Sequence, residues 1–520
     1  MPQQKQRKRR IFVGLFTVMT VCASVYLVVR AILLTMGNLG TWSMVLAALL
    51  LLAESFVVFQ AVAYALNVSQ TVDREAIPRK DFSNWDEAPP VAILLPARHE
   101  PYDVLDKTLT AISNIDYPNK TIFFLDDSSE EKYQHEAEQL ADEYGAVLFQ
   151  REDRHGAKAG VLNDVIEQLD EKYKHIAVFD SDQEPMPAFL KRLVPVMEAN
   201  DRLGLVQTPQ FYTNIDASYV SAGANLQHCM FYEYICEGKS SRGAMMCCGT
   251  NFLLRREAIE DSGGFDESSV TEDFATSLDL LVHGWQSVYY NEVLAFGEAP
   301  ETLSAFLKQQ SRWASGNLQV LKKVIRTLVT HPLKLTVGQW WEFLTTGTYY
   351  LTGWAYLVLM ICPIAYVFFG VPTFFMEPTI YVLTFVPYFA LSLGIFFTSM
   401  ERRYYTPGKL VEGILLGFAA LPVYIKSAVG ALFGVKTSFL RTQKAGATET
   451  EPLWYFWPQT VLWLANFAAL VWGANILGTG LRWPLAVSMI WITYHFFIFS
   501  GFLFFRNMEP EKEYVKANPQ

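Results

Sequence analysis

The sequence predicts a soluble α/β domain inserted into an α-helical transmembrane bundle. Three observations predict this class. Apolar stretches of membrane length lie toward both ends of the chain, and residues 91–332 between them alternate short apolar runs with polar segments of helical length. The composition, 51% hydrophobic and 18% charged, is typical of membrane proteins. A net charge of −10 argues against a nucleic-acid partner, because phosphate binding requires a basic face.

Residues 1–70 predict two transmembrane helices. The first apolar run, Ile11–Met36, follows a basic cluster and has no small-residue cleavage site, so we expect an uncleaved anchor whose basic end is cytosolic. A second run, Thr41–Ala65, returns the chain to the cytosolic side. The polar, proline-containing segment 71–90 is expected to be a linker.

Residues 91–332 predict the catalytic-type α/β domain. The expected buried strands are Val91–Leu95, Thr121–Leu125, Val147–Phe149 and His175–Phe179. The expected helices between them are Tyr102–Asn114, Glu130–Tyr144 and Ala157–Glu171. This alternation predicts a parallel sheet with helices on both faces. Ligands of such sheets bind beyond the carboxyl ends of the strands, where Asp127 and Asp180 are expected.

The remaining sequence predicts four further spans, for six in all. They are Trp341–Phe369 and Ile380–Met400 within residues 333–435, and Trp454–Leu477 and Pro484–Phe505 within residues 451–506. The stretch Leu410–Val435 carries Glu412 and Lys426, and an even number of spans must precede residues 436–450 if these are to reach the cytosol. We therefore expect an interfacial helix there. The tail 507–520 is expected to be cytosolic, with no regulatory domain.

Two aspartates, Asp180 and Asp182, follow the strand that ends at Phe179. Carboxylates two residues apart at a strand end can hold Mg²⁺ or Mn²⁺, which in turn binds a diphosphate. A solvent-exposed acidic turn or a helix N-cap is the alternative explanation, since a lone pair of this kind is a weak signal.

A third acidic string, Thr271-Glu272-Asp273, offers a general base. Transfer of a group to a hydroxyl requires removal of the hydroxyl proton, and a carboxylate such as Asp273 can accept it. Alternatively Thr271 caps a helix that begins at Glu272, where acidic residues are favourable. Both can hold together, because a helix start is a rigid support for a base.

Gln309, Arg312 and Trp313 have the spacing i, i+3, i+4, so a helix would present them on one face. Arg312 could bind a pyrophosphate, and Trp313 could offer its flat apolar surface to a sugar ring. An interfacial tryptophan beside a solvated arginine is the alternative.

Taken together and in order, these strings resemble the processive family-2 glycosyltransferases, the superfamily of cellulose, chitin and hyaluronan synthases. The matching set is Asp126-Asp127, Asp180-Ser181-Asp182, Thr271-Glu272-Asp273 and Gln309-x-x-Arg312-Trp313. Three further segments are similar to the family's: Pro96–Glu100, His155–Asn163 and Ala244–Asn251. The resemblance implies a GT-A type, Rossmann-like domain that uses a UDP-activated sugar.

The resemblance also implies roles for these residues. Asp126, Asp127 and Lys158 would hold the nucleotide, and Pro96, Arg98 and Glu100 would lie at the uracil. Asp182 with Asp180 would bind the metal and diphosphate, and Asp273 would be the base of an inverting transfer, beside Thr271 and Glu272. The acceptor site and its helix would be formed by Cys248, Gly249, Thr250, Gln309, Arg312 and Trp313.

A cytosolic segment at 436–450 resembles the gating loop of cellulose synthases. Phe439, Thr442 and Lys444 match the family's F-x-V-T-x-K pattern, with Arg441 in place of the valine, and Gln183 stands where cellulose synthases usually have histidine. The loop favours UDP-glucose as donor; N-acetylglucosamine and hyaluronan-type polymers are the alternatives.

The implied partners are the donor, the growing glycan, membrane lipid, and accessory or identical subunits. The implied location is the plasma membrane. Two other functions stay open on the sequence: transfer of one sugar to a lipid carrier, and a transporter or channel with a cytosolic binding domain.

Overall fold

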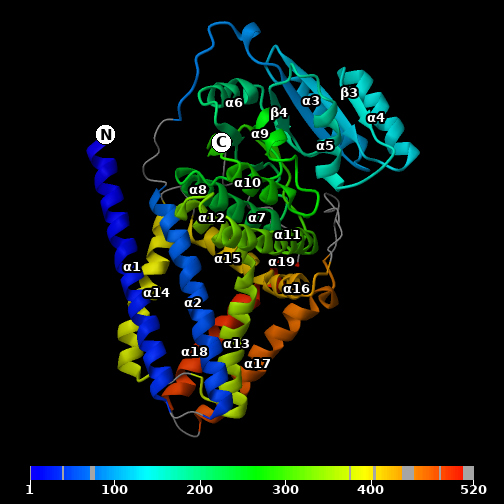
Figure 1. Ribbon diagram of the computed structural model, residues 1–520. Coiled ribbons are helices and arrows are strands. Elements are labelled where there is room, and N and C mark those ends of the chain that lie inside the picture. The colour runs from blue at the N-terminus through cyan, green and yellow to red at the C-terminus, as the bar shows by residue number, and fades with distance from the viewer. Residues whose placement is uncertain are drawn as a thin grey trace.

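The computed structural model describes residues 2–37, 40–70, 77–373, 376–401, 406–435, 450–478 and 482–506, with side chains from residue 11 onward. Figure 1 shows an α/β domain at one end of the molecule and a bundle of long helices at the other. The expected gating-loop residues Phe439, Thr442 and Lys444 and the tail 507–520 lie outside the described residues.

Seven strands form the main sheet, in the order β3-β2-β1-β4-β8-β6-β9. Their bounds are β1 Val91–Ala97, β2 Lys120–Asp126, β3 Val147–Gln150, β4 His175–Val178, β6 Leu203–Gln207, β8 Phe252–Arg255 and β9 Gln286–Tyr289. The central strand β1 is buried along its whole length, as its unbroken apolar sequence requires. A second, three-stranded sheet has the order β5-β10-β7, with β5 Glu184–Pro185, β7 Phe211–Tyr212 and β10 Ala295–Gly297.

The expectation of a parallel sheet is corrected at β8, which runs antiparallel to both β4 and β6. The four strands predicted from the sequence are mutually parallel. β8 differs because residues 244–251, which precede it, already lie at the edge where β4 ends. A strand that starts from that edge must run back against β4.

Helices cover both faces of the main sheet. One face packs on α3 (Tyr102–Ser113), α4 (Glu131–Tyr144) and α6 (Phe189–Glu198). The other packs on α5 (Ala157–Gln168), α9 (Arg256–Asp261) and α10 (Glu272–Val282). This two-layered covering buries the sheet and leaves the strand ends to form a site.

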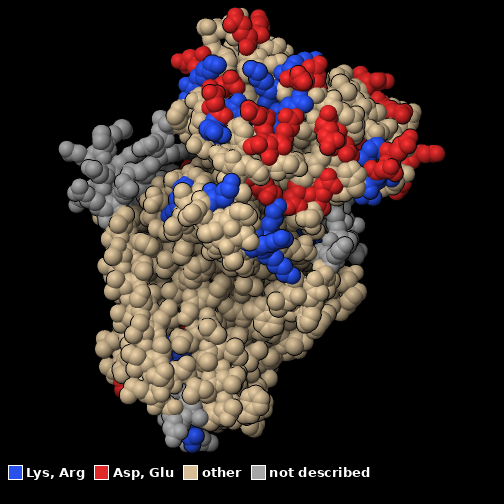
Figure 2. All heavy atoms as spheres, in the orientation of Figure 1, with Lys and Arg blue, Asp and Glu red and all other residues tan. Residues whose placement is uncertain are grey.

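Within the described ranges, six long helices make up the membrane bundle: α1 Pro2–Met36, α2 Thr41–Gln70, α13 Thr352–Phe369, α14 Pro378–Glu401, α17 Trp457–Leu477 and α18 Trp483–Phe499. α1 packs on α2 and α14, and α13 packs on α2, α17 and α18. Figure 2 shows charged side chains gathered on the α/β domain and very few on the half formed by these helices. The protein therefore spans a membrane.

Two predicted segments differ in detail from long straight spans. The expected span from Trp341 lies within a stretch, Val337–Phe369, that is long and apolar enough to cross a membrane, and the structure divides this stretch into α12 (Val337–Thr348), a 3-10 turn at Tyr349–Leu351, and α13. Gly408–Leu432 is long and apolar enough to count as a seventh span. It is divided into α15 (Pro407–Ala419) and α16 (Leu421–Leu432), which lie across the top of the bundle in Figure 1.

A buried ionic cluster joins the domain to the bundle. Glu342 of α12 accepts hydrogen bonds from Lys239 of α8 (Glu237–Ser241) at 3.1 Å, from Arg242 just after it, and from Asn67 of α2 at 3.3 Å. Glu342 is 1% exposed, so its charge is stable only while these cations remain beside it. Through this cluster α12 is attached to both the α/β domain and the membrane bundle, so it lies at the boundary between them.

Candidate active site

A cavity of about 1060 Å³ opens at the carboxyl edge of the main sheet and continues between the membrane helices. Fifteen of the predicted site residues line it: Pro96, Arg98, Glu100, Asp127, Lys158, Asp180, Asp182, Cys248, Gly249, Thr271, Glu272, Asp273, Gln309, Arg312 and Trp313. Its other end is lined by aromatic residues of the bundle and the interfacial helices, among them Tyr349, Tyr350, Tyr356, Phe418 and Tyr424.

Asp180 and Asp182 lie just beyond β4 on the cavity wall. The Lys158 ammonium contacts the Asp180 carboxylate and donates to the Gly249 carbonyl at 2.6 Å. Burial lowers the pKa of Lys158, but Asp180 and Glu272 outweigh it and raise the pKa above its ordinary value. Lys158 is therefore a fixed cation between the sheet edge and the candidate acceptor segment.

The predicted metal site can be tested against the donors that are present. Asp180 and Asp182 supply oxygen ligands at the cavity wall. No third histidine, cysteine or carboxylate completes a metal cluster within the described part of the chain. Two carboxylates suit Mg²⁺ or Mn²⁺, because Mg²⁺ commonly keeps one or two protein carboxylates and takes its remaining ligands from substrate phosphates and water. The residues thus fit an ion that arrives with a diphosphate.

Asp273 is at the start of α10, deep in the protein but open to the cavity. Burial, followed by the charge of Glu272, raises its pKa to about 7, although the Phe274 backbone N–H donates to its Oδ1 at 2.7 Å. Gly249, with φ +84°, approaches so closely that a Cβ at this position would lie 3.3 Å from Asp273 Oδ2. A carboxylate with a pKa near neutrality is well suited to accept a proton.

The long helix α11 (Leu303–Thr330) brings Gln309, Arg312 and Trp313 to the cavity. The indole of Trp313 stacks on the ring of His228, with centroids 5.9 Å apart and planes 26° apart. His228 also stacks on Tyr212 and shares a 2.9 Å hydrogen bond with its hydroxyl. Burial lowers the pKa of His228 to about 3, so this aromatic stack is uncharged at neutral pH.

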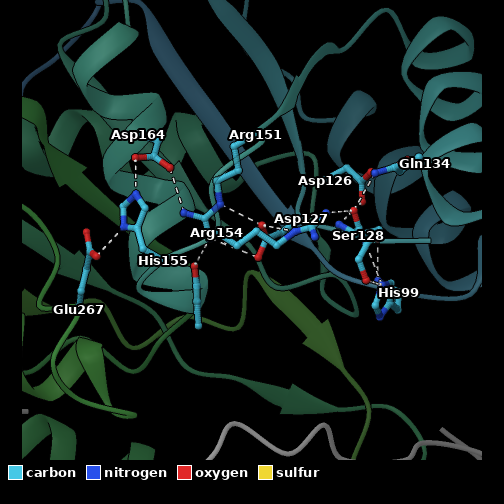
Figure 3. A network of polar contacts seen from close by, with 12 residues as sticks. His99, Asp126, Asp127, Ser128, Gln134, Arg151, Arg154, His155, Asp164 and Glu267 are labelled. Atoms are coloured by element: carbon cyan, nitrogen blue, oxygen red, sulfur yellow. Dashed lines mark hydrogen bonds and ion pairs between the residues drawn. The ribbon is translucent and has the colours of Figure 1, made fainter. Parts of the chain in front are cut away.

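Asp127 is held by a chain of ionic contacts that Figure 3 shows from close by. Arg151 donates to both Asp127 oxygens, at 2.9 and 3.2 Å, and to Asp164 at 2.9 Å. His155 lies between Asp164 and Glu267, with nitrogen–oxygen distances of 3.1 and 2.7 Å. Glu267 belongs to the loop that leads to Thr271, so the chain connects the strand end at β2 with the segment that carries Asp273.

Two predicted residues lie behind the cavity wall. Asp126 is buried and accepts hydrogen bonds from the Ser128 N–H and from Gln150, each at 3.0 Å. Thr250 is also buried, and its hydroxyl accepts from the Asp180 N–H at 2.9 Å. Both shape the turns on which the residues at the wall are mounted.

Four residues of the site were not predicted from the sequence: Tyr212, His228, Arg151 and Glu267. Each acts through a neighbour that was predicted, namely Trp313, Asp127 or the Thr271 segment. Two of the contacts join residues far apart in sequence, 85 residues for His228 and Trp313 and 112 for Glu267 and His155, so spacing along the chain does not reveal them.

Comparison with known proteins places this site in context. Among solved structures, a mannosyltransferase from Pyrobaculum calidifontis, determined with GDP-mannose and Mn²⁺, superposes with a TM-score of 0.55 and 16% identity. The superposition covers 75% of this chain and all of that one. A likeness at this identity supports the fold alone, and that fold is the GT-A type.

Sequence comparison matches part of the chain to a known family and most of it to curated relatives. Residues 175–395 match the family described as glycosyl transferase family group 2. UDP-forming cellulose synthase catalytic subunits from Komagataeibacter sucrofermentans and Komagataeibacter xylinus are each 28% identical, over 85% and 80% of this chain. A cellulose synthase catalytic subunit from Dictyostelium discoideum is 39% identical over 31% of the chain and 16% of its own length.

The family match and these relatives support a cellulose synthase-like glycosyltransferase of family 2. The chain spans 57% and 55% of the lengths of the two Komagataeibacter proteins.

Proposed function

We propose that the protein is a processive, inverting glycosyltransferase that polymerises a UDP-activated sugar into a β-linked glycan and passes the product across the membrane. One observation carries this proposal: a single cavity contains both Asp273 and Trp313 and continues to Tyr356 of α13. A glycan that grows at Trp313 has a path between the membrane helices, and the aromatic residues along it suit sugar rings.

The donor occupies the sheet edge. Pro96, Arg98 and Asp127 surround the nucleotide, and the cations Lys158 and Arg312 bind the diphosphate by charge-assisted hydrogen bonds. Asp180 and Asp182 would hold a divalent ion, which when bound neutralises negative charge on the departing UDP. The ionic contacts behind Asp127 keep its carboxylate oriented while its own charge is balanced by Arg151.

Asp273 performs the proton transfer. It takes the proton from the terminal hydroxyl of the acceptor glycan, whose oxygen attacks the anomeric carbon from the side opposite UDP. The new carbon–oxygen bond forms as the bond to UDP breaks, so UDP leaves with the bonding electrons and the α-linked donor gives a β-linked product. A glycan resting against Trp313 keeps the attacking hydroxyl close to Asp273, which accounts for much of the rate by proximity.

UDP-glucose is the proposed donor, because two similar proteins are named UDP-forming cellulose synthase catalytic subunits and because segment 436–450 resembles their gating loop. The proposed location is the plasma membrane, with the α/β domain cytosolic. The basic residues before Ile11 support this orientation.

The Asp273→Asn variant tests the proposal. It is expected to lose polymer synthesis by about 10² to 10⁴-fold, the contribution of general base catalysis, while binding UDP as the wild type does, because the residue does not hold the nucleotide. Membranes are incubated with individual labelled UDP-sugars, and products are sized on gels. Undiminished synthesis by the variant refutes the role of Asp273, and a single sugar on a lipid establishes the non-processive alternative.

A further inference from the structure

The outer faces of α11 and α16 form an exposed surface that the proposed chemistry does not use. We define the interfacial patch as Lys322, Ile325, Arg326 and Val329 of α11 together with Val429 and Leu432 of α16 and Phe433, which directly follows α16. The apolar members are unusually open: Val329 is 74% exposed, Leu432 77% and Phe433 82%. Exposed apolar side chains grouped in this way mark a surface that contacts a partner or a membrane.

The two helices are fixed side by side at this patch. Lys322 Nζ donates to the carbonyl of Ala431 near the C-terminal end of α16 at 2.6 Å. Ser315 and Ser427 share a 3.0 Å hydrogen bond further along the same pair. On each helix the exposed residues recur every three or four positions, so they form two adjacent stripes. The patch is therefore one continuous surface built from two elements.

The charges of the patch are positive. Lys322 and Arg326 are both exposed, and neither forms an ion pair with any acidic side chain among the described residues. The neighbouring Lys323 differs, since it binds Asp266 and Asp279 at 2.6 Å each. Figure 2 shows basic side chains gathered over α11, at the border between the charged domain and the nearly uncharged helices.

We propose that the interfacial patch binds an anionic phospholipid. The phosphate of the lipid lies between Lys322 and Arg326, and its acyl chains cover Val429, Leu432 and Phe433. Position and charge both favour a lipid over a soluble partner, because the patch continues from the membrane-spanning surface and combines cations with open apolar side chains. This inference concerns binding and does not depend on the proposed glycosyl transfer.

The inner faces of the same helices reach the cavity. Tyr424 of α16 donates to Gln310 of α11 at 2.7 Å, and both residues line the cavity beside Gln309 and Trp313. A lipid that binds the outer faces of both helices would therefore stabilise the position of α11, the helix that carries Trp313. Sugar transfer measured in anionic and neutral bilayers supplies a second readout.

Native mass spectrometry of the full chain in a neutral detergent tests the proposal, with phosphatidylglycerol or phosphatidylcholine added. Phosphatidylglycerol is expected to bind the wild type more tightly. Each cation near a bilayer surface contributes about fivefold, so the double variant Lys322→Gln/Arg326→Gln should weaken phosphatidylglycerol binding by about 25-fold and leave phosphatidylcholine binding unchanged. A matched control is Lys132→Gln/Lys172→Gln, which removes two exposed charges from the α/β domain.

The apolar half of the patch is tested by Phe433→Ser, which should weaken both lipids alike. Equal affinity of the wild type for the two lipids, or full retention of phosphatidylglycerol by the double variant, overturns the proposal. Displacement of the bound lipid by millimolar inorganic phosphate would also overturn it, since that would reveal a site for a soluble anion. If the double variant unfolds, Arg326→Gln alone, with an expected loss of about fivefold, keeps the test decisive.

Discussion

Replacing Glu272 by glutamine should move the pH dependence of sugar transfer to lower pH. Asp273 must be ionised to accept a proton, and its pKa of about 7 places the acid limb of the pH–rate profile near neutrality. After burial, the negative charge of Glu272 is the largest cause that raises this pKa. Glutamine keeps the shape of the side chain and removes that charge, so the pKa of Asp273 should fall.

The size of the shift follows from Coulomb's law. For two like charges several ångströms apart at an effective dielectric constant of about 20, it gives roughly 2 kcal/mol, which corresponds to about 1.5 pKa units. Asp273 lines the cavity, where water screens the pair, so we expect about 1 unit. The acid limb of kcat/KM should move from about pH 7 to about pH 6, and activity at pH 6 should rise about fivefold relative to the plateau.

The assay is the initial rate of UDP release across the pH range at low donor concentration, where kcat/KM reports ionisations of the free enzyme. Glu257→Gln, an exposed change on α9, is the matched control and should leave the profile unmoved. An acid limb that stays in place in Glu272→Gln, or moves to higher pH, would refute the assignment of Asp273 as the titrating base.

Three further predictions concern single residues. Gly249→Ala should reduce kcat at least about tenfold, because the Cβ of the new alanine would contact the Asp273 carboxylate. Gly263→Ala is the control: its φ is similarly positive but no atom lies near the added Cβ, so it should lower only the midpoint of thermal unfolding. Hydrogen bonding to the Glu267 carboxylate raises the pKa of His155, and the contacts of the ring with Asp164 and Glu267 weaken as the pH rises through that raised pKa. The KM for donor should therefore climb as the pH rises above the ordinary histidine value in the wild type, and should not do so in His155→Gln. Glu342→Gln should destabilise the protein by about 3 to 5 kcal/mol in thermal unfolding, since it leaves buried cations unpaired.

Local patterns in the sequence were sufficient for the first half of the sheet. The predicted strands at Val91, Thr121, Val147 and His175 all exist, because each is an apolar run between helical segments. The direction of β8 was not predictable in this way. Its orientation depends on where the preceding segment lies in space, which no local pattern encodes.

The membrane half of the molecule was likewise predicted only in part from the sequence. Hydropathy located the apolar stretch that begins at Trp341, but local patterns did not reveal the 3-10 turn at Tyr349–Leu351 that divides the candidate span Val337–Phe369. α12 also carries Glu342, which forms a buried contact with Lys239, more than a hundred residues earlier in the chain. Long-range ionic contacts of this kind become visible only in the folded structure.

The residues of the candidate site were also predicted only in part. Residues in short motifs, such as Asp180, Asp273 and Trp313, were located because their chemistry and spacing are distinctive. Supporting residues such as His228 and Arg151 were missed, because a buried ring or a paired arginine looks ordinary in sequence and gains its role from what it contacts.

The central claim is that one cavity both forms the polymer and releases it on the far side of the membrane. Proteoliposomes with the α/β domain facing outward, supplied externally with labelled UDP-glucose, test this most directly. The account predicts long β-linked chains that an externally added β-glucanase digests only after detergent opens the vesicles. Polymer that is fully digested in intact vesicles, or label found only as single sugars on lipid, would contradict it.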